Sequence, residues 1–312
     1  MKRIDTVAII LVLLGSSSVL LPALLGAREE NRSLACEKRL RNLAQACVDY
    51  AHVHADRLPS NRRQPPTGWN TLVLPFVGRE DLYNQYNLSE PWWKGTANRA
   101  VGATILSELI CPAAPHGDRM LRLRSPDGEE FSSAATDFVA SAGAYYKNNV
   151  VQRLYRGAMP QTGRFYGGSN VTAQGPLALS EITDGTSLSF LIVEMADKPN
   201  QHPSPGGGSQ EPASEARELV AGSGFGQWIA PNWNHLRSYS SDGKQPFGAC
   251  GVNCSNRASI FSFHQGYANV AFADGSVHRV RAGLDQEVLI ALVSVADGEL
   301  LSLQDYRFEE AQ

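Results

Sequence analysis

The stretch VAIILVLLGSSSVLLPALL, residues 7–25, decides the fold because it holds 19 consecutive residues without a charge. A helix rises about 1.5 Å per residue, so this stretch nearly spans the ~30 Å hydrocarbon core of a bilayer. Lys2 and Arg3 precede it, which favours a cytoplasmic N-terminus. The sequence therefore predicts a single-pass protein of the cell membrane that contacts the bilayer through residues 4–27 and carries its head outside the cytoplasm.

The helical pattern continues beyond the apolar stretch, through residues 28–57. The apolar positions that recur there at helical spacing are Leu34, Leu40, Leu43, Ala44, Cys47, Val48 and Ala51. One long helix, with its first part in the bilayer and its amphipathic second part outside, fits this pattern better than a cleaved secretory signal. Pro22 is expected to kink the helix without ending it.

The rest of the chain, residues 58–312, is expected to form a β-rich head. The 28 glycines and 17 prolines among 312 residues indicate many turns, and the chain is long enough to bury a sizeable core. The predicted fold class is α+β, with a membrane anchor at residues 1–27 that continues into an amphipathic helix at 28–57. A net charge of −3 offers no bulk attraction for nucleic acid, so no such partner is expected.

The five cysteines leave at least one thiol unpaired within the chain. In an oxidising compartment, Cys250 and Cys254 of the segment CGVNC are the pair expected to form a local disulfide. Cys36 and Cys47 would lie about 16 Å apart along a helix, which is too far for a bridge. The loose spacing of CGVNC provides no second ligand pair, so neither a metal nor another cofactor is expected.

The segment SFHQGYANVAFADGSVHRV, residues 262–280, holds a histidine and an Asp-Gly pair with nine residues between them. Asp274-Gly275 predicts the type I′ turn of a β-hairpin, and the Asp274 side chain is expected to cap the amides of that turn. His264 precedes the first strand, so it meets Asp274 only if the chain folds back before the hairpin. The alternative is a metal or acid–base site that joins His264 to Asp274 or His278.

Several of these segments together resemble a bacterial prepilin-like family that joins an N-terminal cleavage and methylation segment to a C-terminal His-x9-Asp-Gly domain of unassigned function. The residues that carry the resemblance are Asp5, Pro22, Arg28, Glu29, Cys36, Leu40, Tyr50, the Cys111-Pro112 pair, His264 and Asp274-Gly275. The resemblance implies a type IV pilin or pseudopilin scaffold with a pilin-like head. Asp5 stands where the family has glutamate, and the family's leader does not precede it. Either the true start lies upstream, or this member is not processed.

Two further pairs of residues invite an interpretation. Asp184-Gly185 predicts a tight turn between a helical turn and a strand. Trp92 and Trp93 belong to an aromatic-rich segment that either lines a carbohydrate-binding surface or covers the core beneath a long loop. The second interpretation of the tryptophans is favoured, because aromatic side chains in long loops commonly bury their apolar area.

The predicted function is that of a membrane-anchored, pseudopilin-like structural or interaction protein of the cell envelope, and not of an enzyme. Asp5 is the predicted assembly residue, because in an assembly it would meet the N-terminal amine of a neighbouring subunit and be neutralised in the bilayer. The expected partners are further copies of the chain or other pseudopilins. The alternative is an anchored extracytoplasmic module that binds an extracellular glycan or another solute. A hydrolase that uses His264, or a catalytic pair of Glu181 and Glu194, is less favoured.

Overall fold

The computed structural model describes residues 3–61, 65–160, 176–203, 217–218, 226–231, 235–298 and 301–309. It has an α+β fold with a long N-terminal helix and mainly antiparallel sheets. The side chains of residues 1–23 lie outside the described part, and with them those of Asp5 and of most of the predicted bilayer segment. Among the helices of the part that is described, none is both long and apolar enough to span a membrane.

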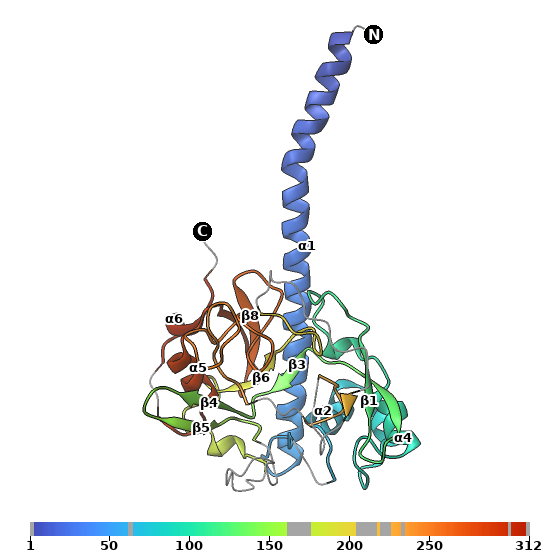
Figure 1. The fold of residues 1–312 in the computed structure, drawn as a ribbon, viewed down its shortest axis with the longest axis vertical. Coiled ribbons are helices and arrows are strands. Elements are labelled where there is room, and N and C mark those ends of the chain that lie inside the picture. Colours follow the sequence, from blue (N-terminus) through green and yellow to red (C-terminus); the bar gives the residue numbers. More distant parts are fainter. Residues whose placement is uncertain are drawn as a thin grey trace.

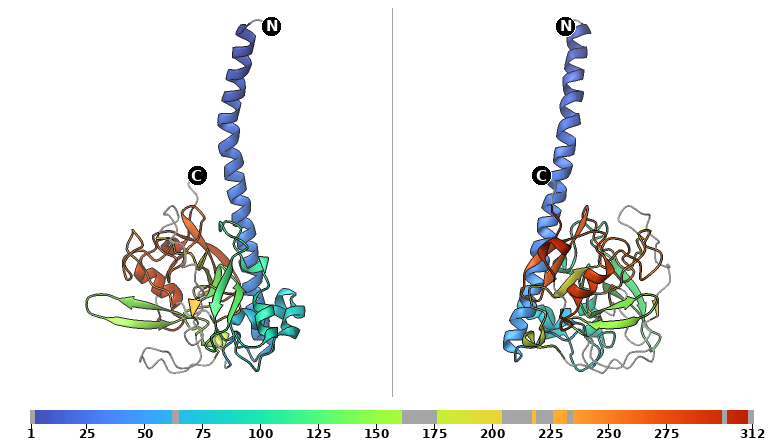
Figure 2. Two further views of the ribbon diagram at one scale, coloured as in Figure 1. Left: turned by 45° about the vertical axis from the view of Figure 1, so that its right-hand side comes forward. Right: turned by 90° about the vertical axis from the view of Figure 1, so that its left-hand side faces the viewer.

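Helix α1 spans Arg3–Val53 in one piece and continues through Pro22. Its N-terminal half stands clear of the rest of the molecule, and its C-terminal half runs into the head (Figure 1 and Figure 2). Ala55 and Asp56 follow the helix with positive φ angles of 55° and 61°, which turns the chain away from the helix axis. The helix is therefore a single rod that belongs to the head over only part of its length.

The head packs against one face of the C-terminal half of α1. The buried residues of that face are Ser33, Cys36, Leu40, Leu43, Ala44, Cys47 and Ala51. Their spacing of three and four residues is the repeat of one side of a helix. Of the apolar positions predicted for residues 28–57, five lie on this face, whereas Leu34 is 51% exposed and Val48 is only partly buried.

Short helices surround α1 on one side of the head. They are α2 (Trp69–Val73), the 3-10 helix η1 (Leu74–Val77), α3 (Glu80–Gln85), α4 (Thr96–Gly102) and the 3-10 helix η2 (Ser107–Leu109). Their apolar side chains form one continuous core with the buried face of α1. The other short helices of the described residues are η3 (Leu179–Glu181), α5 (Gln286–Val293) and α6 (Leu303–Tyr306).

The strands of the described residues form three small sheets. The largest is antiparallel, with the order β3 (Phe138–Ala140), β6 (Phe190–Glu194), β8 (Tyr267–Phe272) and β9 (Val277–Arg281). A second sheet has the order β2 (Glu130–Ala134), β1 (Met120–Arg124) and β7 (Arg217–Glu218), with β7 parallel to β1. The strands β4 (Gly143–Lys147) and β5 (Gln152–Arg156) pair as an antiparallel ribbon.

The four-stranded sheet lies between α1 and α5. Along β8, Ala268, Val270 and Phe272 belong to the core that contains α5, whereas Ala271 belongs to the core built on α1. Successive side chains of a strand point to opposite faces of its sheet, which explains this alternation. The face of the sheet toward α1 also carries the polar side chains described below.

The strands β8 and β9 form the predicted hairpin, but the predicted type I′ turn is wrong. Gly275 has a φ of 86°, whereas Asp274 does not have a positive φ. The N–H of Gly275 donates to the carbonyl of Phe272 at 3.0 Å, and the N–H of Phe272 donates to the carbonyl of Ser276 at 2.9 Å. The turn is therefore a type I turn followed by a left-handed glycine, a bulged form that leaves only one residue at positive φ.

Candidate functional site

His264 of the sequence motif lies inside the head, between α1 and β8. Its side chain is fully buried, and its ring stacks on that of Tyr267 with centroids 5.3 Å apart. Nδ1 lies 3.0 Å from Oε1 of Glu29. Nε2 lies 3.5 Å from Sγ of Cys111 and 3.6 Å from Oε1 of Glu194. These polar partners of His264 come from α1, from the loop after η2 and from β6.

Glu194 is the last residue of β6, and its carboxylate is completely buried. The thiol of Cys36 donates to Oε1 at 2.7 Å, and the backbone N–H of Asn269 donates to Oε2 at 2.6 Å. Each oxygen of the carboxylate thus has a donor, as a buried charged group requires. The amide of Asn269 holds one oxygen on the strand, which directs the other oxygen toward α1.

Cys36 and Cys111 bring two buried free thiols to the same place. Cys36 lies on the buried face of α1, and Cys111 follows η2, where its backbone N–H donates to Oδ2 of Asp137 at 2.8 Å. One potential ligand atom from each of Cys36, Cys111, Glu194 and His264 lies within 4.8 Å of the other three. We call these four residues the cysteine–glutamate–histidine cluster.

The sequence that builds this cluster matches one family model. Residues 26–287 match SBP_bac_10, described as a protein of unknown function (DUF1559), and this range is more than half of the chain. The chain belongs to this family. The matched range includes Cys36 and His264, and therefore the whole cluster. No curated protein and no solved structure matches the chain.

Burial and mutual contact set the charges within the cluster of this DUF1559 protein. Burial raises the pKa of the Cys36 thiol well above its usual value, and Cys111 and Glu194 raise it further. Burial opposes a charged imidazole at His264, but Glu194 and Cys111 outweigh this effect and raise the pKa of His264 to about 12. Burial likewise opposes a charged Glu194, but His264 and Cys36 outweigh it and lower the pKa of Glu194.

In the absence of a cation, these pKa shifts favour a charged His264 imidazolium paired with the Glu194 carboxylate, beside a protonated Cys36 thiol. A thiol is a weak nucleophile unless it loses its proton, and reactive cysteines accordingly have a lowered pKa. Cys36 has the opposite environment. Thiolate catalysis at Cys36 is therefore not the chemistry that this arrangement favours, whereas cation binding and structural cross-linking both fit it.

Three residues of α1 extend the polar contact with the sheet toward the surface. Glu29 reaches His264, as described above. The O–H of Tyr267 donates to Oγ of Ser33 at 2.6 Å, and Nη2 of Arg279 donates to Oε1 of Glu30 at 2.7 Å. Because these contacts involve neighbouring positions on one helix, they fix both the height and the rotation of α1 against β8 and β9.

A second polar network adjoins the cluster through Asp137, whose carboxylate accepts the backbone N–H of Cys111. Asp137 and Asp197 both form ion pairs with Arg119, whose side chain is 6% exposed. Nε2 of His202 lies 2.8 Å from Oδ2 of Asp197, and Nδ1 of His116 lies 3.0 Å from Oδ1 of Asp197. The network joins loop segments that are far apart in the sequence, so it holds the loops around the cluster in place.

The histidine and the aspartate of the His-x9-Asp-Gly motif lie in different places: His264 is buried inside the head, and Asp274 caps the hairpin turn. Oδ1 of Asp274 accepts the N–H of Ser276 at 2.9 Å, which is the predicted capping role. His278 contacts the ring of Phe272 edge-on, with centroids 5.2 Å apart. The structure therefore does not join His264 to Asp274 or His278, because the hairpin carries both residues away from the interior position that His264 occupies.

Asp184 and Gly185 form a turn that also ties down a distant segment. Gly185 has a φ of 101°, which only glycine adopts without strain. The Asp184 carboxylate accepts the backbone N–H groups of Asp297 and Gly298, both at 2.9 Å. The turn predicted from the sequence therefore also holds, through the Asp184 carboxylate, the segment that follows α5.

The remaining predicted residues lie apart from the cluster. Cys250 and Cys254 form a disulfide with their Cα atoms 6.1 Å apart. Trp92 is 1% exposed and packs in the core with its ring 5.7 Å from that of Trp93, which is partly buried. An exposed ligand surface made of both tryptophans is therefore wrong, because Trp92 fills the core beneath its loop.

Sequence reasoning missed the cluster as a unit. The sequence relates Glu194 only to Glu181, and it gives no reason to bring Cys36 and Cys111 together. One signal was present, because the resemblance described above rests on segments that hold Glu29, Cys36, Cys111 and His264. Nothing in the sequence spacing shows that these segments meet, since more than 150 residues separate the partners Cys36 and Glu194, or Cys111 and His264.

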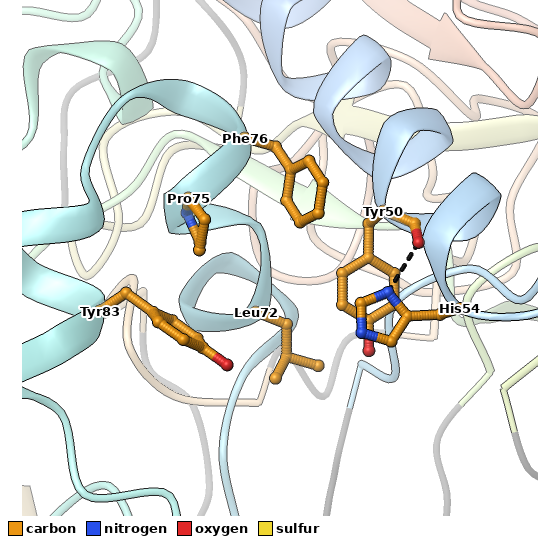
Figure 3. A pocket seen from close by; sticks show the side chains of 6 residues that line it. All are labelled: Tyr50, His54, Leu72, Pro75, Phe76 and Tyr83. Carbon is orange, nitrogen blue, oxygen red and sulfur yellow. Dashed lines mark hydrogen bonds between the residues drawn. The ribbon is translucent and has the colours of Figure 1, made fainter.

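The surface of the head carries a hollow of about 460 Å³ at the C-terminal end of α1. Its lining residues are Tyr50, His54, Leu72, Pro75, Phe76 and Tyr83, which Figure 3 shows around the opening. The rings of Tyr50 and His54 stack 3.7 Å apart, and Nδ1 of His54 lies 2.8 Å from the carbonyl oxygen of Tyr50. This hollow is an aromatic surface that a small apolar or carbohydrate ligand could contact.

Proposed function

We propose that this protein is a membrane-anchored, pseudopilin-like structural or interaction protein of the cell envelope, with its head outside the cytoplasm. The observation that carries the proposal is the N-terminal half of α1, which leaves the head and stands clear of the other described elements (Figure 1). Leu24 and Leu25, the first apolar residues whose side chains are described, are 58% and 55% exposed.

A projecting apolar helix needs a partner in place of water. An isolated helix is marginally stable in water, and a helix that is apolar on all sides is normally buried. Residues 7–25 have no charge in the sequence and only three polar side chains, those of Ser16, Ser17 and Ser18, so most of this part is unsuited to solvent. A bilayer, or a bundle of like helices within it, provides the apolar surroundings.

The firm attachment of α1 to the head also supports an assembly role. The buried face of α1 and the polar contacts of Glu29, Glu30 and Ser33 join the helix to both the core and the sheet. Helices that pack together in a membrane would therefore hold their heads in a fixed arrangement. Within such a bundle, the acidic side chain of Asp5 would be stabilised by the N-terminal amine of a neighbouring copy.

Membrane attachment is tested by placing charge in the apolar segment. Lysine at the centre of a spanning helix costs about 2.5–3.5 kcal/mol per residue. The double variant Leu13→Lys/Leu14→Lys is expected to move the protein from the membrane fraction to the soluble fraction. The matched control, Leu34→Lys/Val53→Lys, adds the same charge to exposed positions of the same helix and should leave the distribution unchanged. Wild-type protein in the soluble fraction would contradict the proposal.

Assembly is tested by shearing cells and pelleting the released material at high speed. We expect the wild-type protein in the pellet as polymer and Asp5→Ala in the cell membrane as single chains. Asp49→Ala is the control, because Asp49 lies on the same helix and contacts only Gln45 among the hydrogen bonds of its side chain in the described structure. Equal pelleting of the wild type and Asp5→Ala would remove the assembly role of Asp5.

The aromatic hollow of Figure 3 favours a second candidate function, an anchored module that binds a glycan or another solute. A panel of soluble glycans tested by calorimetry on the full chain would identify a binder. Phe76→Ala and Tyr83→Ala should weaken its binding, whereas Tyr146→Ala on β4, outside the hollow, should not. No binding across the panel would leave the structural role as the better account.

A further inference from the structure

We propose that the cysteine–glutamate–histidine cluster binds one Zn²⁺ ion through Sγ of Cys36, Sγ of Cys111, Oε1 of Glu194 and Nε2 of His264. Four protein donors complete a tetrahedral shell and leave no position for water or substrate. This is the arrangement of a structural zinc site rather than a catalytic one. The inference is independent of the proposed function, since it concerns how α1 is fastened to the head.

The two donor distances measured from Nε2 of His264 fit a tetrahedral shell. Zinc–ligand bonds of about 2.0–2.3 Å place neighbouring donors roughly 3.3–3.8 Å apart. Nε2 of His264 lies 3.5 Å from Sγ of Cys111 and 3.6 Å from Oε1 of Glu194. The contact of Cys36 Sγ with Glu194 Oε1, at 2.7 Å, is shorter than this spacing and has to lengthen when the ion binds. Binding displaces to solvent the thiol protons of both cysteines and the Nε2 proton of the His264 imidazolium, and it lets Cys36 Sγ and Glu194 Oε1 separate.

The chemistry of the donors selects among the common cations. Ca²⁺ takes about six to eight oxygen ligands and Mg²⁺ demands an octahedron of oxygens, neither of which this cluster offers. Thiolate and imidazole ligands suit zinc, and a tetrahedral set of sulfur and nitrogen donors is typical of it. Two of the three free cysteines of the chain, Cys36 and Cys111, lie in the cluster, and the third, Cys47, is the natural internal control.

Two ligands are held in orientation by further contacts. Histidine ligands of zinc usually donate their second ring N–H to a carboxylate, which fixes the tautomer and aims the other nitrogen at the metal. Glu29 stands in this position, with Oε1 3.0 Å from Nδ1 of His264. On Glu194, the amide of Asn269 occupies Oε2 at 2.6 Å and leaves Oε1 toward the cluster. The contacts that would orient two zinc ligands, one on His264 and one on Glu194, are therefore already present.

The position of the site gives it a structural consequence. Its ligands come from α1, from the loop after η2, from the end of β6 and from the loop just before β8. A bound ion would cross-link the projecting helix to the core of the head at one point. Since metal binding stabilises only the folded state, removal of the ion should loosen α1 before it unfolds the sheets.

The first test measures metal in the full chain, purified without chelators or immobilised-metal columns. Mass spectrometry of the elements should find one zinc per chain. Replacement by Co²⁺ should give thiolate charge-transfer bands and the visible bands of a tetrahedral ion. Cys36→Ser and Cys111→Ser should lose both signals, and Cys47→Ser, an equally buried thiol of α1 outside the cluster, should keep them.

Glu29 provides a test that does not depend on a ligand variant folding. Glu29 is a positioning residue, and its loss should weaken the affinity for Zn²⁺, measured by competition with a chromophoric chelator, by about 10- to 100-fold. Glu29→Gln keeps an acceptor for Nδ1–H and should lie between Glu29→Ala and the wild type. Glu30→Ala is the control, because the neighbouring Glu30 pairs with Arg279 and not with His264.

Three outcomes would overturn the metal site. One is a chain that binds no zinc or cobalt, before or after reduction, although Cys36, Cys47 and Cys111 are all reduced. Another is a disulfide between Cys36 and Cys111, detected by alkylation and peptide mass spectrometry, which would leave Cys47 as the sole free thiol. A metal lost equally from Cys47→Ser and Cys36→Ser would also contradict it.

Discussion

Glu29 and His264 are 235 positions apart in the sequence, yet Oε1 of one lies 3.0 Å from Nδ1 of the other. The first residue belongs to α1 where the helix enters the head, and the second lies just before β8. The contact joins the helix that projects from the molecule to the histidine of the sequence motif. The buried side of this junction is the cysteine–glutamate–histidine cluster, so the motif marks the place where α1 is fastened.

The bond between Tyr267 and Ser33, at 2.6 Å, should contribute measurably to this fastening. Tyr267→Phe leaves the buried Ser33 hydroxyl without its donor, which we expect to lower the free energy of unfolding by about 1–2 kcal/mol. The double variant Tyr267→Phe/Ser33→Ala should cost less than the sum of the two single variants, because their effects are coupled. Chemical denaturation of all three measures this cycle, and strict additivity would show that the bond contributes nothing.

Arg119 should be among the most sensitive charged residues of the head. It pairs with the fully buried carboxylates of Asp137 and Asp197, so Arg119→Met removes the arginine partner of two buried carboxylates. We expect a loss of about 3–5 kcal/mol in the free energy of unfolding. Arg122→Met, which breaks an exposed pair with Glu130, should cost far less, because solvent screens that pair. Similar losses for both variants would be inconsistent with a buried network.

The hairpin turn can be tested at Gly275, whose φ is 86°. Space is available for a methyl group, since the nearest atom is Oε1 of Gln45 at 3.6 Å, so the cost of Gly275→Ala comes from the backbone. A left-handed conformation costs a residue with a Cβ roughly 1–2 kcal/mol, which should appear in thermal unfolding. Gly26→Ala, in the open part of α1, should not destabilise the head. Equal effects at both sites would contradict this account of the turn.

His235 should make the head sensitive to mild acid. Burial, and then the nearby Arg237, lower the pKa of His235 to about 4, while histidine in an unfolded chain titrates near 6.5. The folded state thus binds fewer protons, so the stabilisation is complete above about pH 6.5 and is lost as the pH falls toward 4. The loss is on the order of 3 kcal/mol.

The variant His235→Phe keeps a ring against Tyr145, whose centroid lies 5.3 Å from that of His235. Its free energy of unfolding should depend less steeply on pH between 6.5 and 4 than that of the wild type, because the unfolded state no longer gains this proton. Urea denaturation at a series of pH values measures both slopes. Identical slopes would assign the acid sensitivity to other groups.

Local features of the head could be predicted because their causes are local. The three- and four-residue spacing from Cys36 to Ala51 marks the buried face of α1, and Asp274-Gly275 marks a hairpin. The exact turn type could not be predicted, because type I′ and the bulged turn share the same Asp-Gly signal and differ in how the flanking strands pair. Trp92 likewise has the same sequence context whether it lies on a surface or in a core.

The sequence by itself determined the long helix, its apolar first part, the hairpin and the short disulfide loop between Cys250 and Cys254. Each depends on residues within a few turns of one another, so composition and spacing are sufficient. Only the tertiary structure decided that Cys36, Cys111, Glu194 and His264 meet. Their segments come together because the core and the sheet pack around α1, and such long-range packing has no signature in the spacing of four polar residues.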